Sequence, residues 1–323
     1  MTLSILLLIL GLGLVVAGAD ILVDGASSLA RRLGVSEFVI GLTIVGFGTS
    51  LPELVVSVTG ALQGNSDIAI GNVVGSNVFN VLLILAVSAL IRPIPVTRSN
   101  RRRDIPLTLG ATLLLVVLGM SGALFGPGGP DGLSRLEGGI FTVLFAAYIV
   151  SCFRSGGKED TEQDDARQEA RLFPNALAIV MVLGGLLGLV FGGRLFVNSA
   201  EKIARLLHVS DKFIAITVLA IGTSLPEFVT SLVALAKRRS QMALGNILGS
   251  NVFNILLILG TAALIHPMSF ASIGLVDVAA LVLSALLVLM SVFIGKRNMI
   301  DRLDGAIMLT AFAGYMVWLF VKL

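Results

Sequence analysis

Long apolar segments, separated by short polar stretches, follow one another along almost the entire chain. About ten of them reach the roughly 20 residues that a helix needs to cross the hydrocarbon core of a bilayer. They lie near residues 3–23, 38–62, 68–91, 105–125, 136–153, 174–193, 213–236, 241–265, 271–295 and 303–321. No Lys or Arg precedes the first segment and no small-residue cleavage site follows it, so we interpret it as a helix rather than a signal peptide. The pattern predicts an all-α polytopic membrane protein with about ten transmembrane helices.

The composition agrees with this interpretation and excludes several other classes of protein. Hydrophobic residues make up 56% of the chain and charged residues 13%, whereas a soluble domain carries roughly 25% charged residues. The single cysteine, Cys152, excludes a disulfide framework, and two histidines leave little for a transition-metal site. We therefore expect no cofactor. The net charge of +3 does not point to nucleic acid, because basic residues on a membrane protein report its topology.

The basic residues are distributed unevenly between the two sides of the predicted bundle. With ten spans, 17 of the 23 Lys and Arg residues fall in loops on one side. The positive-inside rule assigns those loops, which follow the odd-numbered spans, to the cytoplasm. We therefore expect a multi-pass protein of the cell (inner) membrane with both termini extracytoplasmic. The polar stretch 154–173 is expected to be a cytoplasmic linker.

The chain contains an internal repeat. The segment GNVVGSNVFNVLLIL at 71–85 aligns with GNILGSNVFNILLIL at 245–259, with 12 of 15 positions identical. The offset of 174 residues also separates the two copies of GTSLPE, at 48–53 and 222–227. The constant offset is explained by two units of five helices each, 1–153 and 174–323. Because five is odd, the second unit enters the membrane from the opposite side, and such inverted repeats bind their ligands at the repeat interface near the midplane.

Each GTSLPE copy places a carboxylate deep inside an apolar span. Glu53 follows 15 uncharged residues and precedes 13, and Glu227 follows 14 and precedes 9. An ionised carboxylate at this depth costs at least ~2.5 kcal/mol on insertion scales. The central spans offer no Lys or Arg to pair with it. We therefore expect both side chains to face a protein cavity and to meet a cation or a proton, the structural alternative being a protonated Glu in an interhelical hydrogen bond.

The prolines of the two copies predict that the second and seventh helices are discontinuous. Pro52 and Pro226 have no N–H, so the carbonyl groups four residues earlier lose their helical partners. Freed carbonyls inside a membrane have to line a polar cavity or find new partners. Together with the carboxylates and the hydroxyls of Ser50 and Ser224, they form a set of hard oxygen ligands of the kind that Ca²⁺ prefers.

The third and eighth helices supply polar side chains at four-residue spacing, on the face expected to meet the broken helices. These residues are Asn72, Ser76 and Asn80 in the first half and Asn246, Ser250 and Asn254 in the second. Their position favours a ligand role for the two serines and for Asn80 and Asn254. Asn77 and Asn251 point elsewhere, and for them a structural hydrogen-bonding role is expected.

The paired GTSLPE and GN-x-x-GSN-x-FN blocks resemble the alpha-repeats of the calcium/cation antiporter superfamily, specifically the sodium/calcium exchanger membrane family in its compact prokaryotic form. The resemblance implies a core of helices 2, 3, 7 and 8, across which helices 1 and 6 slide to alternate access. It also implies that Glu53 and Glu227 hold Ca²⁺ together with the backbone carbonyls of Thr49 and Thr223. The implied Na⁺ sites use Gly46, Thr49, Ser50 and Ser76 in one half and Ala220, Thr223, Ser224 and Ser250 in the other, while Asn80 and Asn254 match the middle position.

The sequence leaves the coupling ion open. The flanking serines and threonines favour Na⁺, and the amide of Asn254, where potassium-dependent relatives carry Asp, argues against a K⁺ requirement. Proton-coupled calcium antiporters also lack that Asp, so a Ca²⁺/H⁺ antiporter is the alternative. An intramembrane hydrolase is disfavoured because Ser50 and Ser224 have no His or Lys nearby. We therefore expect no enzymatic activity, and the expected partners are Ca²⁺, Na⁺ or H⁺ and the lipid bilayer, with no obligatory protein partner evident.

Overall fold

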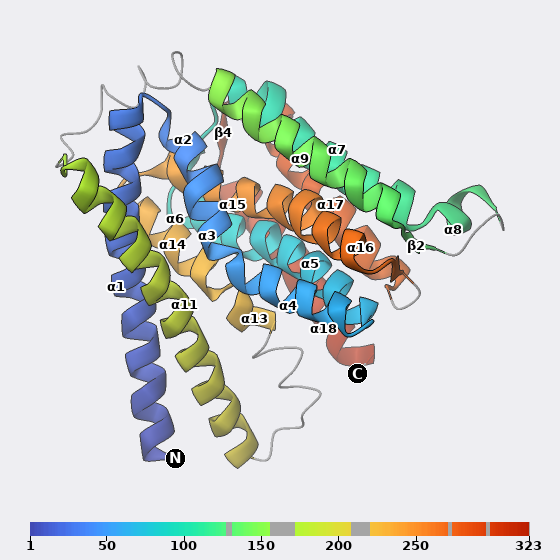
Figure 1. Ribbon diagram of the computed structural model, residues 1–323, viewed down its shortest axis with the longest axis horizontal. Coiled ribbons are helices and arrows are strands. Elements are labelled where there is room, and N and C mark those ends of the chain that lie inside the picture. The colour runs from blue at the N-terminus through green and yellow to red at the C-terminus, as the bar shows by residue number, and fades with distance from the viewer. Residues whose placement is uncertain (127–130, 156–171, 208–219, 271–272, 295–297, 323) are drawn as a thin grey trace.

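The computed structural model describes residues 1–126, 131–155, 172–207, 220–270, 273–294 and 298–322. The predicted linker 154–173 therefore lies largely outside the described residues. Helices make up nearly all of the described chain, and its strands form two short pairs (Figure 1).

The helices of the first half follow the predicted order. They are α1 (Thr2–Leu33); α2 (Glu37–Ile40), the π-helical η1 (Gly41–Val45), α3 (Gly46–Thr49) and α4 (Leu51–Leu62); α5 (Ser66–Phe79), η2 (Asn80–Leu85) and α6 (Ala86–Ile91); η3 (Asn100–Asp104), α7 (Ile105–Gly119) and α8 (Ser121–Phe125); and α9 (Arg135–Ser155). The second half contains α11 (Asn175–Leu206); α13 (Ala220–Thr223) and α14 (Leu225–Ala236); α15 (Ser240–Val252), η5 (Phe253–Leu259) and α16 (Gly260–Ile265); α17 (Leu275–Phe293); and α18 (Arg302–Lys322).

The prediction of an all-α polytopic fold with a broken second helix is confirmed. Within the described residues, seven helices are long and apolar enough to cross a membrane. The pair Glu37–Thr49 and Leu51–Leu62, bent by 50°, makes an eighth span. The two remaining predicted spans correspond to η3–α7–α8 and to α13–α14, and the first part of the latter span lies outside the described residues.

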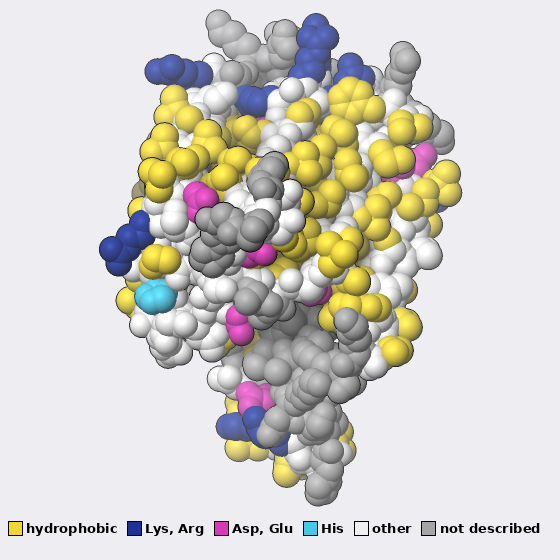
Figure 2. All heavy atoms as spheres, turned by 90° about the vertical axis from the view of Figure 1, so that its right-hand side faces the viewer, with side chains coloured by type: hydrophobic (Ala, Val, Ile, Leu, Met, Phe, Trp, Pro, Cys, Tyr) yellow, Lys and Arg dark blue, Asp and Glu magenta, His cyan; other side chains and the backbone are white. Residues whose placement is uncertain are grey.

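The loops separate into two ends of the molecule. Strand β1 (Ile94–Pro95) pairs with β4 (Met299–Ile300), which joins the loops after the third and ninth spans. Strand β2 (Gly132–Leu133) pairs with β3 (Met268–Ser269), which joins the loops after the fourth and eighth spans. Figure 2 shows Lys and Arg side chains gathered at the upper end of the molecule, to which the β1–β4 loops belong; we call it the basic end.

The sidedness of the loops gives a labelling prediction. A cysteine introduced as Ser99→Cys at the basic end should react with an impermeant maleimide only from the cytoplasmic side, and Gln63→Cys at the other end only from outside. Cys152 is fully buried and should not react, so it needs no replacement. Labelling of Ser99→Cys in intact cells by the impermeant reagent would overturn the predicted orientation.

Helices α1 and α11 form a pair whose backbones touch. A Cβ atom added at Gly18 would lie 2.8 Å from Gly185 O, and one added at Gly11 would lie 2.9 Å from Gly192 O. A Cβ atom added at Gly25 would lie 2.9 Å from Ala178 O. The contact positions thus rise along α1 while they fall along α11, so the two helices run antiparallel. Figure 1 shows this pair extending beyond the rest of the bundle at the N-terminal end of α1.

Both helices are longer than predicted. The first span was expected to end near residue 23, but α1 continues to Leu33 and stops at Gly34, which adopts a left-handed φ of 65°. The predicted boundary lies between the charged residues Asp20 and Asp24. In the structure Lys237 Nζ lies 2.8 Å from a carboxylate oxygen of each, so the helix carries these charges without ending.

A second polar contact joins α1 to the core at the basic end. Ser27, on the same face of α1 as the two aspartates, donates to Glu37 Oε1 at 2.7 Å. The Glu37 carboxylate also pairs with the guanidinium of Arg239, and both side chains are largely buried. Two contacts therefore join α1 to the segment between α14 and α15: Lys237 pairs directly with the aspartates of α1, and Arg239 is linked to Ser27 through Glu37.

The predicted fourth span, 105–125, is not one straight helix. Helix α7 ends at Gly119, and Met120 leaves helical geometry with φ −115° and ψ 31° before the short α8 begins. The ring of Phe270 packs so closely on Gly119 that a Cβ there would lie 2.6 Å from it.

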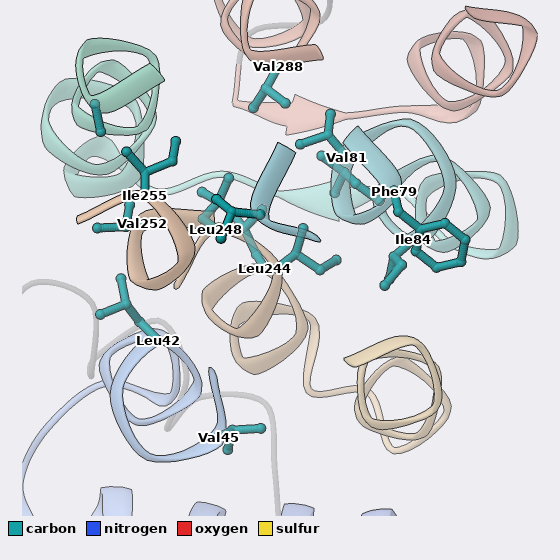
Figure 3. Packing of buried hydrophobic residues seen from close by; sticks show 14 of the residues in the cluster. Leu42, Val45, Phe79, Val81, Ile84, Leu244, Leu248, Val252, Ile255 and Val288 are labelled. Atoms are coloured by element: carbon teal, nitrogen blue, oxygen red, sulfur yellow. The ribbon is translucent and has the colours of Figure 1, made fainter. Parts of the chain in front are cut away.

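The third and eighth spans form the buried centre of the bundle. Figure 3 shows Leu244, Leu248 and Val252 of α15 and Ile255 of η5 surrounded by side chains of both halves, among them Leu42 and Val81. In the most apolar stretch of the α15–α16 span, 83% of the residues are buried, compared with 11% in the corresponding stretch of α18. The third and eighth spans are thus largely covered by the other helices.

Candidate cation site

The second and seventh helices break at equivalent residues with nearly the same geometry. Ser50 has φ −84° and ψ 7°, and Ser224 has φ −88° and ψ 7°. Each new helix carries its proline at the start, where the missing N–H has no intrahelical partner to lose. Glu53 and Glu227 consequently stand in the first turns of α4 and α14. The positive end of the helix dipole stabilises a carboxylate at that position.

The two carboxylates are hydrogen-bonded across the repeats. Ser50 Oγ donates to Glu227 Oε1 at 2.9 Å, and Ser224 Oγ donates to Glu53 Oε1 at 3.2 Å. Both glutamates are 1% exposed. Each broken helix therefore supplies a carboxylate to the site and a hydroxyl to the carboxylate of the other half.

The residues expected to bind Na⁺ are grouped differently in the structure. Each expected set came from one half of the chain, whereas the contacts combine residues of both halves. Ser76 Oγ lies 3.3 Å from Ser224 Oγ, so Ser76 belongs with the broken helix of the second half. A Cβ atom on Gly46 would lie 3.4 Å from Ser250 N, which places Ser250 beside the broken helix of the first half. The structure groups these residues differently because the inverted repeats place the part of each broken helix up to the break against the third or eighth span of the other half.

The remaining predicted ligands lie at the same breaks. Thr49 is fully buried at the end of α3, and its hydroxyl donates to Asn246 Oδ1 at 3.2 Å. Thr223 is half-buried at the end of α13, next to Ser224. Ala220 is the first residue of α13, and its side chain lies outside the described part of the chain.

Four asparagines connect the third and eighth spans to each other. Asn80 Nδ2 donates to Asn251 Oδ1 at 3.0 Å, and Asn254 Nδ2 donates to Asn77 Oδ1 at 2.9 Å. Asn80 begins η2 and Asn254 lies in η5, two π-helical segments whose wider turns are frequent at functional sites. The hydrogen-bonding role expected for Asn77 and Asn251 agrees with these contacts.

Several oxygen atoms of the predicted ligands have no hydrogen-bond partner. Among the described residues, Glu53 Oε2, Glu227 Oε2, Asn80 Oδ1, Asn254 Oδ1 and Ser250 Oγ are buried without one. Leaving a buried polar atom unsatisfied costs about 1–3 kcal/mol, and more for a charged group. Carboxylate and amide oxygens can only accept, and oxygen ligands of this kind fit a hard cation such as Ca²⁺ or Na⁺.

Two pairs of side chains that hold the glutamate helices in place were not predicted as a unit. Asn72 Nδ2 donates to the backbone carbonyl of Glu53 at 3.2 Å and to Ser57 Oγ at 3.0 Å. Asn246 Nδ2 makes the matching bonds to Glu227 O at 3.3 Å and to Ser231 Oγ at 2.9 Å. The two serines recur at the repeat offset, four residues after each glutamate, and that spacing is the signal by which they could have been found.

A bundle of membrane-spanning helices that encloses paired carboxylates, unsatisfied oxygens and two broken helices defines a membrane transporter for cations, not an enzyme. The family model described as sodium/calcium exchanger protein matches residues 3–154 and 177–321. The chain belongs to this family.

Individual relatives match nearly the whole chain. The "Putative antiporter CaxA" of Alkalimonas amylolytica is 39% identical over 99% of both chains, and the "Sodium/calcium exchanger MaX1" of Methanosarcina acetivorans is 34% identical over 99% of both. Among solved structures, the sodium-calcium exchanger NCX_Mj soaked with Na⁺ and Sr²⁺ superimposes with a TM-score of 0.84 at 32% identity, covering 98% of each chain. These likenesses confirm the fold and the family inferred from the two motif blocks.

Proposed function

We propose that this protein is a secondary antiporter that exchanges Ca²⁺ for Na⁺. The observation that carries the proposal is the group of buried, unsatisfied oxygens around Glu53 and Glu227. The two carboxylates supply about two negative charges, which matches one Ca²⁺. The backbone carbonyls of Thr49 and Thr223, at the helix breaks, complete the calcium site together with the amide oxygens of the middle position.

Two neutral sets of oxygens beside the carboxylates take Na⁺. One set consists of Gly46, Thr49, Ser50 and Ser250 and lies beside Glu227; the other consists of Ala220, Thr223, Ser224 and Ser76 and lies beside Glu53. The hydrogen bonds from Ser50 to Glu227 and from Ser224 to Glu53 support this division. The names of MaX1 and NCX_Mj, both sodium/calcium exchangers, favour Na⁺ as the coupling ion.

Transport proceeds by alternating access in this proposal, with the α1–α11 pair sliding over the core of the second, third, seventh and eighth spans. The two repeat units, 1–153 and 174–323, build the site together, and 154–173 links them in the cytoplasm. Both termini are placed outside the cell (inner) membrane, because the basic end then faces the cytoplasm.

The Ca²⁺/H⁺ alternative uses the same carboxylates as proton carriers. A flux experiment distinguishes the two. Proteoliposomes loaded with ⁴⁵Ca²⁺ should release it when Na⁺ is offered outside, and K⁺ or a pH step at zero Na⁺ should release none above the leak. Release driven by the pH step alone would replace Na⁺ coupling by proton coupling.

Removal of the flanking hydroxyls gives a further prediction. Ser76→Ala and Ser250→Ala should each raise the Na⁺ concentration for half-maximal Ca²⁺ release several-fold and change the half-saturating Ca²⁺ less. Each serine contributes to a sodium set and lies outside the pair that neutralises Ca²⁺. Na⁺ titrations of ⁴⁵Ca²⁺ release at fixed Ca²⁺ provide the measurement, and wild-type sodium dependence in both variants would contradict sodium sites at these hydroxyls.

A further inference from the structure

Two buried amides, Asn77 and Asn251, contact members of the proposed ligand set without belonging to it. Asn254 Nδ2 donates to Asn77 Oδ1, and Asn80 Nδ2 donates to Asn251 Oδ1. All four side chains are at most 3% exposed. Each contact joins one repeat to the other, since Asn77 and Asn80 lie in the third span and Asn251 and Asn254 in the eighth.

The orientation of an amide decides whether it can bind a cation. Its oxygen accepts and its NH₂ group donates, and the two ends have nearly the same shape, so the hydrogen-bond partners determine which end points where. If Asn254 turned over, it would present two positively polarised hydrogens to the cation instead of an oxygen.

A backbone carbonyl fixes the orientation of the pair Asn77 and Asn254. Asn77 Nδ2 donates to Asn251 O at 3.3 Å, and a carbonyl can only accept, so the nitrogen of Asn77 has to face it. The amide oxygen of Asn77 then faces Asn254, and because this oxygen can only accept, Asn254 has to donate from its Nδ2. Asn254 Oδ1 is consequently the end left without a partner among the described residues, as is Asn80 Oδ1 in the other half.

We infer that Asn77 and Asn251 are positioning residues that hold Asn254 and Asn80 with their amide oxygens, rather than their NH₂ groups, toward the transported cation. The inference rests on the proposed cation site and adds to it the groups that set the polarity of its middle position. Asn77 acts on Asn254 and Asn251 on Asn80, so each repeat orients a ligand of the other.

The test replaces Asn77 by a side chain of similar size that cannot accept a hydrogen bond. Asn77→Leu should raise the half-saturating Ca²⁺ concentration for exchange about tenfold, because Asn254 can then turn its NH₂ group toward the ion. The Ca²⁺ dependence of exchange in proteoliposomes measures this shift. Thr112→Val, which removes a buried hydroxyl bonded at 2.9 Å to Thr108 O within α7, should leave it unchanged.

A second substitution separates positioning from a merely structural role. Asn254→Asp carries oxygen at both ends, so its orientation no longer matters. The double variant Asn77→Leu/Asn254→Asp should therefore have a half-saturating Ca²⁺ within about threefold of Asn254→Asp alone. If Asn77 served only to hold the helices together, the tenfold loss would persist in the double variant.

The outcomes distinguish this inference from the proposed function. A wild-type protein that exchanges no Ca²⁺ would overturn the proposed function. Normal wild-type exchange with an unchanged half-saturating Ca²⁺ in Asn77→Leu, or a double variant that shows the full loss, would overturn the positioning role while the proposed function stood. If Asn77→Leu fails to fold, Asn251→Leu with Asn80→Asp tests the same relation in the other half.

Discussion

Ca²⁺ transport should be abolished by replacing either buried carboxylate with its amide, as Glu53→Gln or Glu227→Gln, while the protein still folds. The amide has the size of the carboxylate and can still accept the hydrogen bond from Ser224 or Ser50. It removes one of two negative charges from a site where both are 1% exposed. Removing one partner from a buried set of charges costs about 3–5 kcal/mol, which corresponds to a loss in affinity on the order of a hundredfold or more.

Uptake of ⁴⁵Ca²⁺ into Na⁺-loaded proteoliposomes measures this loss, and a monodisperse elution profile shows that the variants fold. Glu201→Gln is the matched control, because Glu201 is only half-buried and pairs at 3.0 Å with Arg205 of its own helix. It should transport as the wild type does. Near-normal calcium exchange by either glutamate variant would show that the two carboxylates do not share one site.

The second large effect is expected at the contact between α1 and α11. Gly18→Leu should reduce transport at least tenfold, because its Cβ would lie 2.8 Å from Gly185 O and 2.9 Å from Leu189 N. Backbone atoms cannot move aside as a flexible side chain does, so the helices have to separate. Forcing extra atoms into a packed contact costs typically about 1–3 kcal/mol.

Gly13→Leu provides the control on the same helix, because a Cβ there meets nothing within 4 Å. This variant should keep wild-type transport and thermal stability, whereas Gly18→Leu should lose either the pair geometry or the fold. Exchange rates and the midpoint of thermal unfolding in detergent should be measured for both. Equal behaviour of the two variants would mean that the close approach of the helices has no role in transport.

Hydropathy and the repeat were sufficient to predict the spans, their inversion and the breaks at Ser50 and Ser224. These features depend on local composition and on one alignment offset, both of which a single sequence contains. The C-terminal end of α1 could not be predicted, because Asp20 and Asp24 are neutralised by Lys237, more than 200 positions away in the chain.

The two motif blocks name the candidate site residues individually, but they do not say which of these residues meet in space. An offset of 174 residues shows which positions are equivalent and says nothing about which positions meet. Ser76 meets Ser224, and Ser50 meets Glu227, only because two inverted units pack face to face. The same holds for the amide pair Asn77 and Asn254, whose orientation depends on the backbone carbonyl of Asn251 in the other repeat.

The ionic contacts of α1 at the basic end make the two ends of this duplicated molecule unequal. The equivalents of Asp20, Asp24 and Ser27 on α11 are Arg194, Asn198 and Glu201, and Glu201 pairs within its own helix. In the proposed cycle, moving α1 at the basic end requires Lys237 to release Asp20 and Asp24 and Ser27 to release Glu37, whichever ion is bound. Contacts of this kind stabilise one of the two access states, but their free energy cancels over a complete exchange cycle. The two ion gradients alone then set the direction of net calcium flow, and the contacts of α1 affect only its rate.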